Sequence, residues 1–213
     1  METERAEGIV LRVHPVTESS LIVTWFTREA GKVKTMAKGA RRPKSPFRGK
    51  IDLFYRDESV FLRSKRSDLH LLHECFLETA HARLRGSVES LAGASYVAEL
   101  VDLITETEDP NREMFELLAV TLRQLEKIVS GALVLWFELR LLSVAGWRPR
   151  WETGKTVSKV LGSLAGAKID GAGRVRLTGA QLAEARQSVW NFWDAEVTRV
   201  PRTRKFFAEQ IRH

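Results

Sequence analysis

The chain of 213 residues contains one cysteine, Cys75, and two tyrosines. A single cysteine excludes an internal disulfide framework and a thiol-only zinc site, and it fits a reducing compartment. Long apolar runs are also missing, since the longest, around residues 132–144, contains Glu138 and Arg140 and is too short to span a bilayer. Because the N-terminal residues METERAEG lack the apolar core of a signal peptide, we expect a cytoplasmic protein with no membrane partner.

Acidic residues are scarce at both ends of the chain. Residues 1–68 carry 15 Lys/Arg against 9 Asp/Glu, residues 69–146 carry 6 against 12, and residues 147–213 carry 13 against 6. The resulting charges of +6, −6 and +7 sum to the +7 of the whole chain. This segregation indicates polyanion binding by the ends, although a basic surface also serves solubility.

The first 75 residues predict short β-strands. Runs rich in β-branched and aromatic residues are separated by turn residues, and we expect a turn at Asp57-Glu58. In the third run Val33 and Thr35 alternate with Lys32 and Lys34, which places the lysines on one face. Strands of this spacing favour a small antiparallel barrel of the OB type. The expected strands cover residues 8–13, 21–26, 32–38, 51–55, 60–63 and 69–72.

From about Cys75 onward the apolar residues recur with a helical period. We expect helices from residue 88, after an N-cap at Asp109, from residue 133 to Gly146, and after a capping box that begins at Thr178. The prediction is an α+β (mixed) fold: an N-terminal OB-fold β-barrel over residues 1–75, followed by an α-helical domain over residues 76–213.

A basic cluster from Arg28 to Lys50 is the strongest functional signal. It contains nine Lys/Arg against one acid, Glu29, and its arginines can fork onto phosphate oxygens. Phe47 and Tyr55, if exposed, could stack on bases. A solvated, charged barrel face is the alternative interpretation. The candidate DNA-binding residues are Lys32, Lys34, Lys38, Arg41, Arg42, Lys44, Arg48 and Lys50.

Catalytic and metal-binding patterns are absent or poor, and we expect neither an enzyme nor a cofactor. Gly154-Lys155-Thr156 ends like a phosphate-binding loop, but Pro149 stands where an earlier glycine is required. One group of His and Cys residues could be imagined as metal ligands, but its spacing matches no standard zinc site, and core or surface positions are the better interpretation. That group is His70, His73, Cys75 and His81.

Several segments resemble the RecO family of DNA repair proteins. The most specific is Lys38-Gly39-Ala40-Arg41-Arg42-Pro43-Lys44-Ser45, which is similar to the family's basic segment. The resemblance is good over residues 1–75, recognisable to about 150 and thin afterwards. Its other segments are residues 7–11, 18–23, 26–32, 67–72, 137–142 and 146–149.

The resemblance implies an OB-fold followed by a helical domain, and a recombination mediator that helps load the recombinase. Such proteins bind single- and double-stranded DNA and anneal complementary strands without ATP, which places this chain at the nucleoid. Their partners are RecR and the C-terminal tail of single-stranded DNA-binding protein. Many members also carry a four-cysteine zinc site, but residues 150–177 contain no cysteine. We therefore expect no zinc and a shortened remnant of that region.

Two other functions fit the same residues. The chain could be a protein–protein adapter with weak DNA affinity, especially if an apolar groove rimmed by basic residues stays open in the helical domain. It could also be an RNA-binding OB module. Salt-sensitive DNA binding that depends on Arg41 and Arg42 would favour the mediator over the adapter, and competition between RNA and DNA would separate the third.

Overall fold

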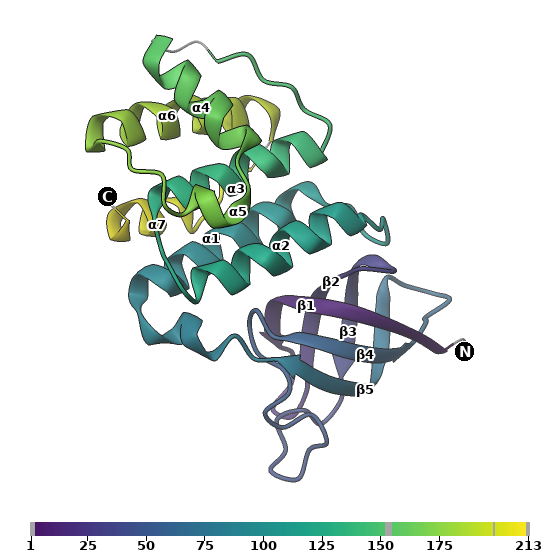
Figure 1. Cartoon of the computed structure of the whole chain (residues 1–213). Coiled ribbons are helices and arrows are strands. Elements are labelled where there is room, and N and C mark those ends of the chain that lie inside the picture. Colours follow the sequence, from purple (N-terminus) through teal and green to yellow (C-terminus); the bar gives the residue numbers. More distant parts are fainter. Residues whose placement is uncertain (1–2, 152–154, 198, 212–213) are drawn as a thin grey trace. The chain divides into compact units, whose positions relative to one another are not determined.

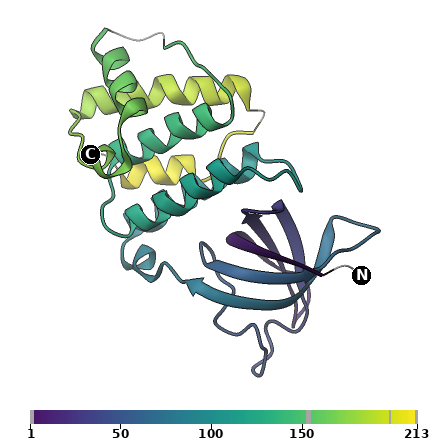
Figure 2. The same cartoon turned by 45° about the vertical axis from the view of Figure 1, so that its right-hand side comes forward.

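The computed structural model describes residues 3–151, 155–197 and 199–211 of the chain (Figures 1 and 2). Its contacts form two compact units. The first joins Met1–His81 with Thr105–Glu116, and the second joins Ala82–Ile104 with Leu117–His213. Over the described residues, no helix is long and apolar enough to cross a membrane. Gly154 of the phosphate-loop-like motif, and residues 152–154 of the expected zinc-region remnant, lie outside the described residues.

The first unit contains a closed five-stranded barrel with the strand order β1-β2-β3-β5-β4. All neighbouring strands are antiparallel except β3 and β5, which pair in parallel from Lys34↔Leu69 to Met36↔Leu71. This topology confirms the expected OB-type barrel. The strands are β1 (Thr3–Pro15), β2 (Leu21–Thr27), β3 (Gly31–Ala37), β4 (Arg56–Leu62) and β5 (Leu69–Thr79).

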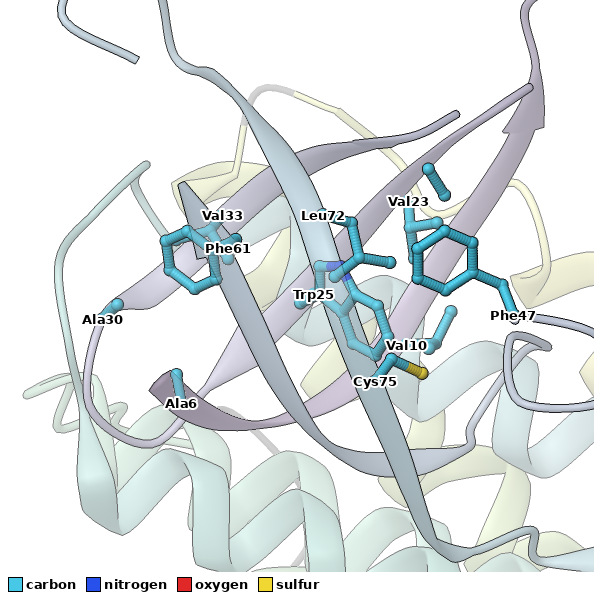
Figure 3. Close-up of a cluster of buried hydrophobic side chains, with 11 residues drawn as sticks. Ala6, Val10, Val23, Trp25, Ala30, Val33, Phe47, Phe61, Leu72 and Cys75 are labelled. Carbon is cyan, nitrogen blue, oxygen red and sulfur yellow. The ribbon is translucent and has the colours of Figure 1, made fainter. Parts of the chain in front are cut away.

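The barrel interior is filled by apolar side chains around Trp25 (Figure 3). Trp25 is fully buried, and its Nε1 donates to Thr35 Oγ1 at 2.8 Å, so the indole N–H is satisfied in the core. One of the core residues, Phe47, comes from the connection between β3 and β4 rather than from a strand. The others include Ala6, Val10, Val23, Ala30, Val33, Ala37, Phe61, Leu72 and Cys75.

Residues 105–116 return to the barrel and belong to the first unit, which the sequence pattern did not anticipate. The Phe115 ring lies 6.3 Å from that of Phe26 on the outside of β2. Glu108 accepts a charge-assisted hydrogen bond from Arg63 at 2.9 Å and contacts His70 Nε2 at 2.8 Å. The Arg63 guanidinium also holds the pKa of Glu108 below its usual value. The polar contacts of Glu108 and the aromatic contact of Phe115 therefore attach residues 105–116 to the barrel.

Two strand predictions in the barrel were wrong. Asp57 and Glu58 do not form a turn but lie inside β4, where Asp57 is buried in the barrel and Glu58 faces outward to Arg5 at 2.8 Å. Strand alternation accommodates this acidic pair by pointing the two side chains in opposite directions. Residues 51–55 form turns instead of a strand, with Phe54 at a φ of 67°. In addition, β5 continues through Cys75 to Thr79, beyond the expected end at residue 72.

The second unit is a helical bundle with α3 at its centre. In this bundle α3 packs against α1, α4, α5 and α6, while α7 packs against α1. The central position of α3 agrees with its nearly continuous burial. The helices of the chain are η1 (Ala82–Gly86), α1 (Val88–Ile104), α2 (Arg112–Leu125), α3 (Gly131–Val144), α4 (Lys155–Gly166), α5 (Ile169–Ala172), α6 (Gly179–Glu196) and α7 (Arg204–Gln210), and α2 belongs to this unit from Leu117 onward.

Most predicted helix ends are confirmed, with two corrections. Gly146 follows α3 at a φ of 88°, and Thr178 and Gln181 form the predicted capping box. The cap of α2 is not Asp109, because Asn111 Oδ1 accepts from the backbone N–H of Met114 at 2.9 Å. The helix expected from residue 133 begins two residues earlier, because Gly131 is the first residue of α3 and Ser130 caps it.

Candidate nucleic-acid interface

Two of the predicted DNA-binding lysines lie on the outward face of β3. Burial alternates along this strand: Gly31, Val33, Thr35 and Ala37 are buried, whereas Lys32, Lys34 and Met36 are partly exposed. The predicted division of the strand into a core face and a lysine face is therefore confirmed. Lys38 follows at the end of the strand and is exposed.

The other predicted residues lie on the basic loop, which we define as residues 38–50 and which extends from one end of the barrel (Figures 1 and 2). It is a succession of turns rather than an open coil. Backbone N–H groups donate three residues back, from Arg42 to Gly39, Ser45 to Arg42, Arg48 to Ser45 and Lys50 to Phe47, at 3.0–3.2 Å. The two glycines of the loop, Gly39 and Gly49, have φ values of 69° and 73°, which residues with a Cβ rarely adopt.

Two arginines of the basic loop donate hydrogen bonds to backbone carbonyl groups. Arg41 donates from Nη1 to the carbonyl of Thr17 at 3.2 Å and from its backbone N–H to the carbonyl of Ser19 at 3.0 Å. The loop is thereby attached to the β1–β2 connection. Arg48 Nη1 donates to the carbonyl of Pro43 at 3.2 Å, within the loop itself.

Base stacking by Phe47 is contradicted by its position. Phe47 is only 6% exposed, and its ring points into the barrel beside Val23 and Val10 (Figure 3). Tyr55 is half-buried and packs against the same core. In the sequence Phe47 lies within the basic cluster and Tyr55 close to it, which suggested stacking, but the fold packs both side chains against the barrel core.

The cations of the region fall into two groups. Lys34 contacts Asp68 Oδ2 at 2.9 Å, and its ammonium lowers the pKa of that carboxyl. Arg28, which the sequence placed in the basic cluster, pairs with Glu7 at 2.7 Å and also with Glu116. In contrast, within the described part of the chain, exposed Lys38, Arg42 and Lys44 make no ion pair with a carboxylate. These three are the cations most available to a phosphate.

Asp68 is the residue of this surface that sequence reasoning missed. It lies in the β4–β5 connection, 34 positions from Lys34. The two residues meet because β3 and β5 pair in parallel, with Lys34 opposite Leu69. The pattern around residues 67–72 signalled a strand but carried no indication of which strand it would join.

A buried carboxyl–thiol pair lies beneath the end of the basic loop. Cys75 Sγ is 3.7 Å from Asp57 Oδ1 and 3.6 Å from the carbonyl oxygen of Lys50. Burial raises the pKa of Asp57 to about 7 and that of the Cys75 thiol to about 12. Burial therefore keeps Cys75 in the thiol form at neutral pH, and the thiolate is the form that attacks or binds metals.

The histidines of this region do not assemble with Cys75. His70 is buried and stacks on Phe61 with a centroid distance of 5.3 Å, whereas His73 is exposed. Across residues 3–151, 155–197 and 199–211, no group of three or more His, Cys, Asp or Glu side chains is arranged to hold a metal ion.

A second candidate site lies in the helical unit. A cavity of about 580 Å³ opens between the start of α3, the segment after α5 and the start of α6. Apolar side chains line it, and exposed Arg174 and Arg176 stand at its edge. Its size falls within the range of ligand-binding pockets. The lining residues are Ile128, Ser130, Gly131, Ala132, Gly173, Arg174, Val175, Arg176, Leu177 and Leu182.

Comparison with known proteins places this barrel and bundle in a family. The family model for the N-terminal part of recombination protein O matches residues 1–80, and the model for its C-terminal part matches residues 85–154. The chain belongs to the RecO family. The resemblance that the sequence suggested is therefore confirmed, and it extends over most of the chain.

Curated relatives named DNA repair protein RecO support this membership. The one from Syntrophus aciditrophicus is 35% identical over 148 residues, which are 69% of this chain and 57% of the relative. The one from Pelotomaculum thermopropionicum is 36% identical over 166 residues, or 78% and 63% of the two chains. The one from Halalkalibacterium halodurans is 36% identical over 146 residues, or 68% and 57%.

The chain spans between 57% and 63% of the length of these three RecO relatives. The basic loop lies inside the N-terminal family match. The cavity lies partly outside both matches, because its α5 and α6 sides follow residue 154.

Proposed function

We propose that this chain is a recombination mediator of DNA repair that binds single- and double-stranded DNA and anneals complementary strands without ATP, without catalysing a covalent reaction. The basic surface, which we define as the outward lysines of β3 together with the basic loop, would contact phosphates. The observation that carries the proposal is the group of exposed cations, Lys38, Arg42 and Lys44, on a loop built of successive turns.

Backbone contact suits annealing. Phosphate contacts give affinity with little sequence preference, and they leave the base edges free to pair with a second strand. Lysines and arginines that displace counterions also make binding steeply salt-dependent. Helping a recombinase onto single-stranded DNA also requires affinity for any sequence, together with release of the strand when the recombinase binds.

The test is annealing of two complementary oligonucleotides without ATP at two salt concentrations. We expect the wild-type chain to accelerate annealing, more so at the lower salt, and the Arg42→Glu/Lys44→Glu variant, which keeps the Arg41 anchor, to lose this activity while remaining folded. A matched control, Arg123→Glu/Lys127→Glu, changes the same number of exposed charges on the helical unit and should anneal like the wild type. Folded wild-type protein that does not anneal at either salt concentration would refute the mediator proposal.

A specific observation favours an adapter role in addition. The cavity of the helical unit combines an apolar lining with Arg174 and Arg176, and such a site fits an acidic peptide that ends in an apolar side chain. The C-terminal tail of single-stranded DNA-binding protein and RecR are the partners that we propose for this chain. The cavity supports the first of these more directly, because a short tail can enter it.

Titration of a fluorescent peptide copy of that tail would test this second role. We expect saturable binding that weakens about tenfold in an Arg174→Glu/Arg176→Glu variant, since reversing two charges at a site rim removes attraction and adds repulsion. The Arg42→Glu/Lys44→Glu variant should bind the peptide like the wild type. Equal binding by both variants would show that the cavity is not the peptide site.

A further inference from the structure

Phe47 joins the basic loop to the inside of the barrel. It is the central residue of the sequence Ser45-Pro46-Phe47-Arg48-Gly49, so it has basic residues within three positions on either side. Its ring is 6% exposed and belongs to the same buried cluster as Val10, Val23 and Trp25 (Figure 3). The basic loop is therefore attached to the barrel not only at its two ends but also through the buried side chain of Phe47.

Two polar anchors complete the attachment of the loop. On one side Arg41 is held by the carbonyls of Thr17 and Ser19. On the other side the Cys75 thiol lies 3.6 Å from the Lys50 carbonyl as its hydrogen-bond donor. Phe47 lies between these anchors, and its own backbone N–H donates to Ser45 Oγ at 3.2 Å.

A loop fixed in this way presents its charges at lower entropic cost. Ordering a long, flexible side chain on binding costs about 0.5–1.5 kcal/mol, and further cost arises if the backbone must be ordered as well. Because the backbone between residues 38 and 50 already has its turns formed, a bound phosphate chain would have to order only the side chains of Lys38, Arg42 and Lys44.

We propose that Phe47 is a positioning residue of the DNA-binding surface, which holds the basic loop in its phosphate-binding conformation from inside the barrel without touching DNA. The inference rests on the proposed function and deepens it. It replaces the base-stacking role that the sequence suggested for Phe47 with a positioning role that its burial allows.

The experiment compares DNA affinity and its salt dependence for four versions of the full chain: the wild type, Phe47→Ala, Phe47→Leu and Leu72→Ala. Leu72 is 3% exposed and lies in the same core on β5, so its truncation weakens the barrel without releasing the loop. We expect Phe47→Ala to lose about tenfold or more in affinity, because the loop must then be ordered on binding. The affinities of Leu72→Ala and Phe47→Leu should remain within about twofold of that of the wild type. Leu72→Ala keeps Phe47 in the core, and Phe47→Leu keeps a large apolar side chain at that position.

A double-mutant cycle distinguishes positioning from general loss of stability. If Phe47 acts through the loop cations, Arg42→Ala should cost less affinity in the Phe47→Ala background than in the wild type, because the displaced loop no longer presents Arg42. Lys159→Ala, a change on α4 of the helical unit, should have the same effect on affinity in both backgrounds. Additive losses for Phe47 and Arg42 would overturn the inference.

Hydrogen exchange of the wild-type chain tests the same point even if Phe47→Ala does not fold. The amide hydrogens of Ser45, Arg48 and Lys50, which donate within the loop, should exchange far more slowly than in an unstructured peptide. Exchange at the unstructured rate would refute a fixed loop. Absence of salt-sensitive binding by the wild type would refute the proposed function, whereas normal binding by folded Phe47→Ala would refute only the role of Phe47.

Discussion

The two units of the chain place their charged side chains in opposite ways. In the barrel, the cations of the basic loop lie outside, and several contact no carboxylate within the described residues. In the helical unit, charge lies at the centre: Glu138 is 1% exposed, and the buried guanidinium groups of Arg186 and Arg204 interact with it electrostatically. Its Oε1 accepts from Tyr96 Oη at 2.6 Å and from Trp190 Nε1 at 3.0 Å.

Each unit also buries a carboxyl group whose pKa is raised, Asp57 in the barrel and Glu138 in the bundle, and the two groups have different partners. Burial raises the pKa of both Asp57 and Glu138 to about 7. Asp57 has a weak thiol partner, and its Oδ2 has no hydrogen-bond partner. Glu138 instead connects α1, α3 and α6 through two strong donors. We infer that the barrel tolerates its carboxyl group, whereas the bundle is organised around its own.

The largest predicted effect is on the stability of the helical unit. Glu138→Ala should destabilise it by about 3–5 kcal/mol, because Tyr96 Oη and Trp190 Nε1 would lose their buried acceptor and Arg186 would lose the nearby carboxyl group. Asp57→Ala at pH 8 should not destabilise the barrel to a comparable extent, since the truncation loses only a weak thiol hydrogen bond and removes a carboxylate whose charged form burial disfavours. Urea unfolding, with hydrogen exchange to separate the two units, would measure both changes. A Glu138→Ala loss as small as that of Asp57→Ala would remove the distinction.

The next effect is a pH dependence that each unit should show separately. Asp and Glu ordinarily ionise near 3.8 and 4.5, so between those values and about 7 the folded chain holds protons that the unfolded chain has released. The contribution of these two groups to stability should therefore be greatest near their ordinary pKa values and should fall as pH rises to about 7, by at most about 1.4 kcal/mol per pH unit for each group.

Isosteric amides test the origin of this slope. Glu138→Gln keeps an oxygen acceptor for Tyr96 and Trp190 and should flatten the slope in the helical unit only. Asp57→Asn should flatten it in the barrel only. The measurement is urea unfolding between pH 5 and pH 8, again resolved by hydrogen exchange in each unit. A slope that neither amide variant changes would assign the pH dependence to other groups.

A smaller effect, on binding rather than stability, separates free from paired cations. Lys44→Ala should weaken DNA binding and reduce the slope of log affinity against log salt by about 0.9 for duplex DNA, or about 0.7 for single strands, as expected for one lost phosphate contact. Arg5→Ala removes an exposed cation that already pairs with Glu58 and should leave the slope unchanged. Binding titrations at four salt concentrations would decide, and equal slope changes in both variants would contradict the division into two groups.

The sequence predicted the local features of the chain better than its distant pairings. The barrel, the lysine face of β3, the end of α3 at Gly146 and the capping box at Thr178 follow from residue types over a few positions. The stacking prediction for Phe47 was wrong because an aromatic residue among lysines suggests a stacking group. No local pattern shows that its side chain packs into the barrel core. The return of residues 105–116 to the barrel depends on Glu108 meeting Arg63 and His70, which no local pattern encodes.

The smallest predicted effect is a gain of affinity. Asp68 Oδ2 contacts the Lys34 ammonium at 2.9 Å and would compete with a DNA phosphate for it. Exposed ion pairs contribute little, so Asp68→Asn should strengthen DNA binding by only about two- to fivefold. The gain should vanish in a Lys34→Ala background, because Asp68 would then have no cation to release. A gain that persists without Lys34 would show that Asp68 acts by general repulsion of DNA, and no gain in either background would mean that β3 lies outside the DNA-binding surface, leaving the basic loop as the whole of it.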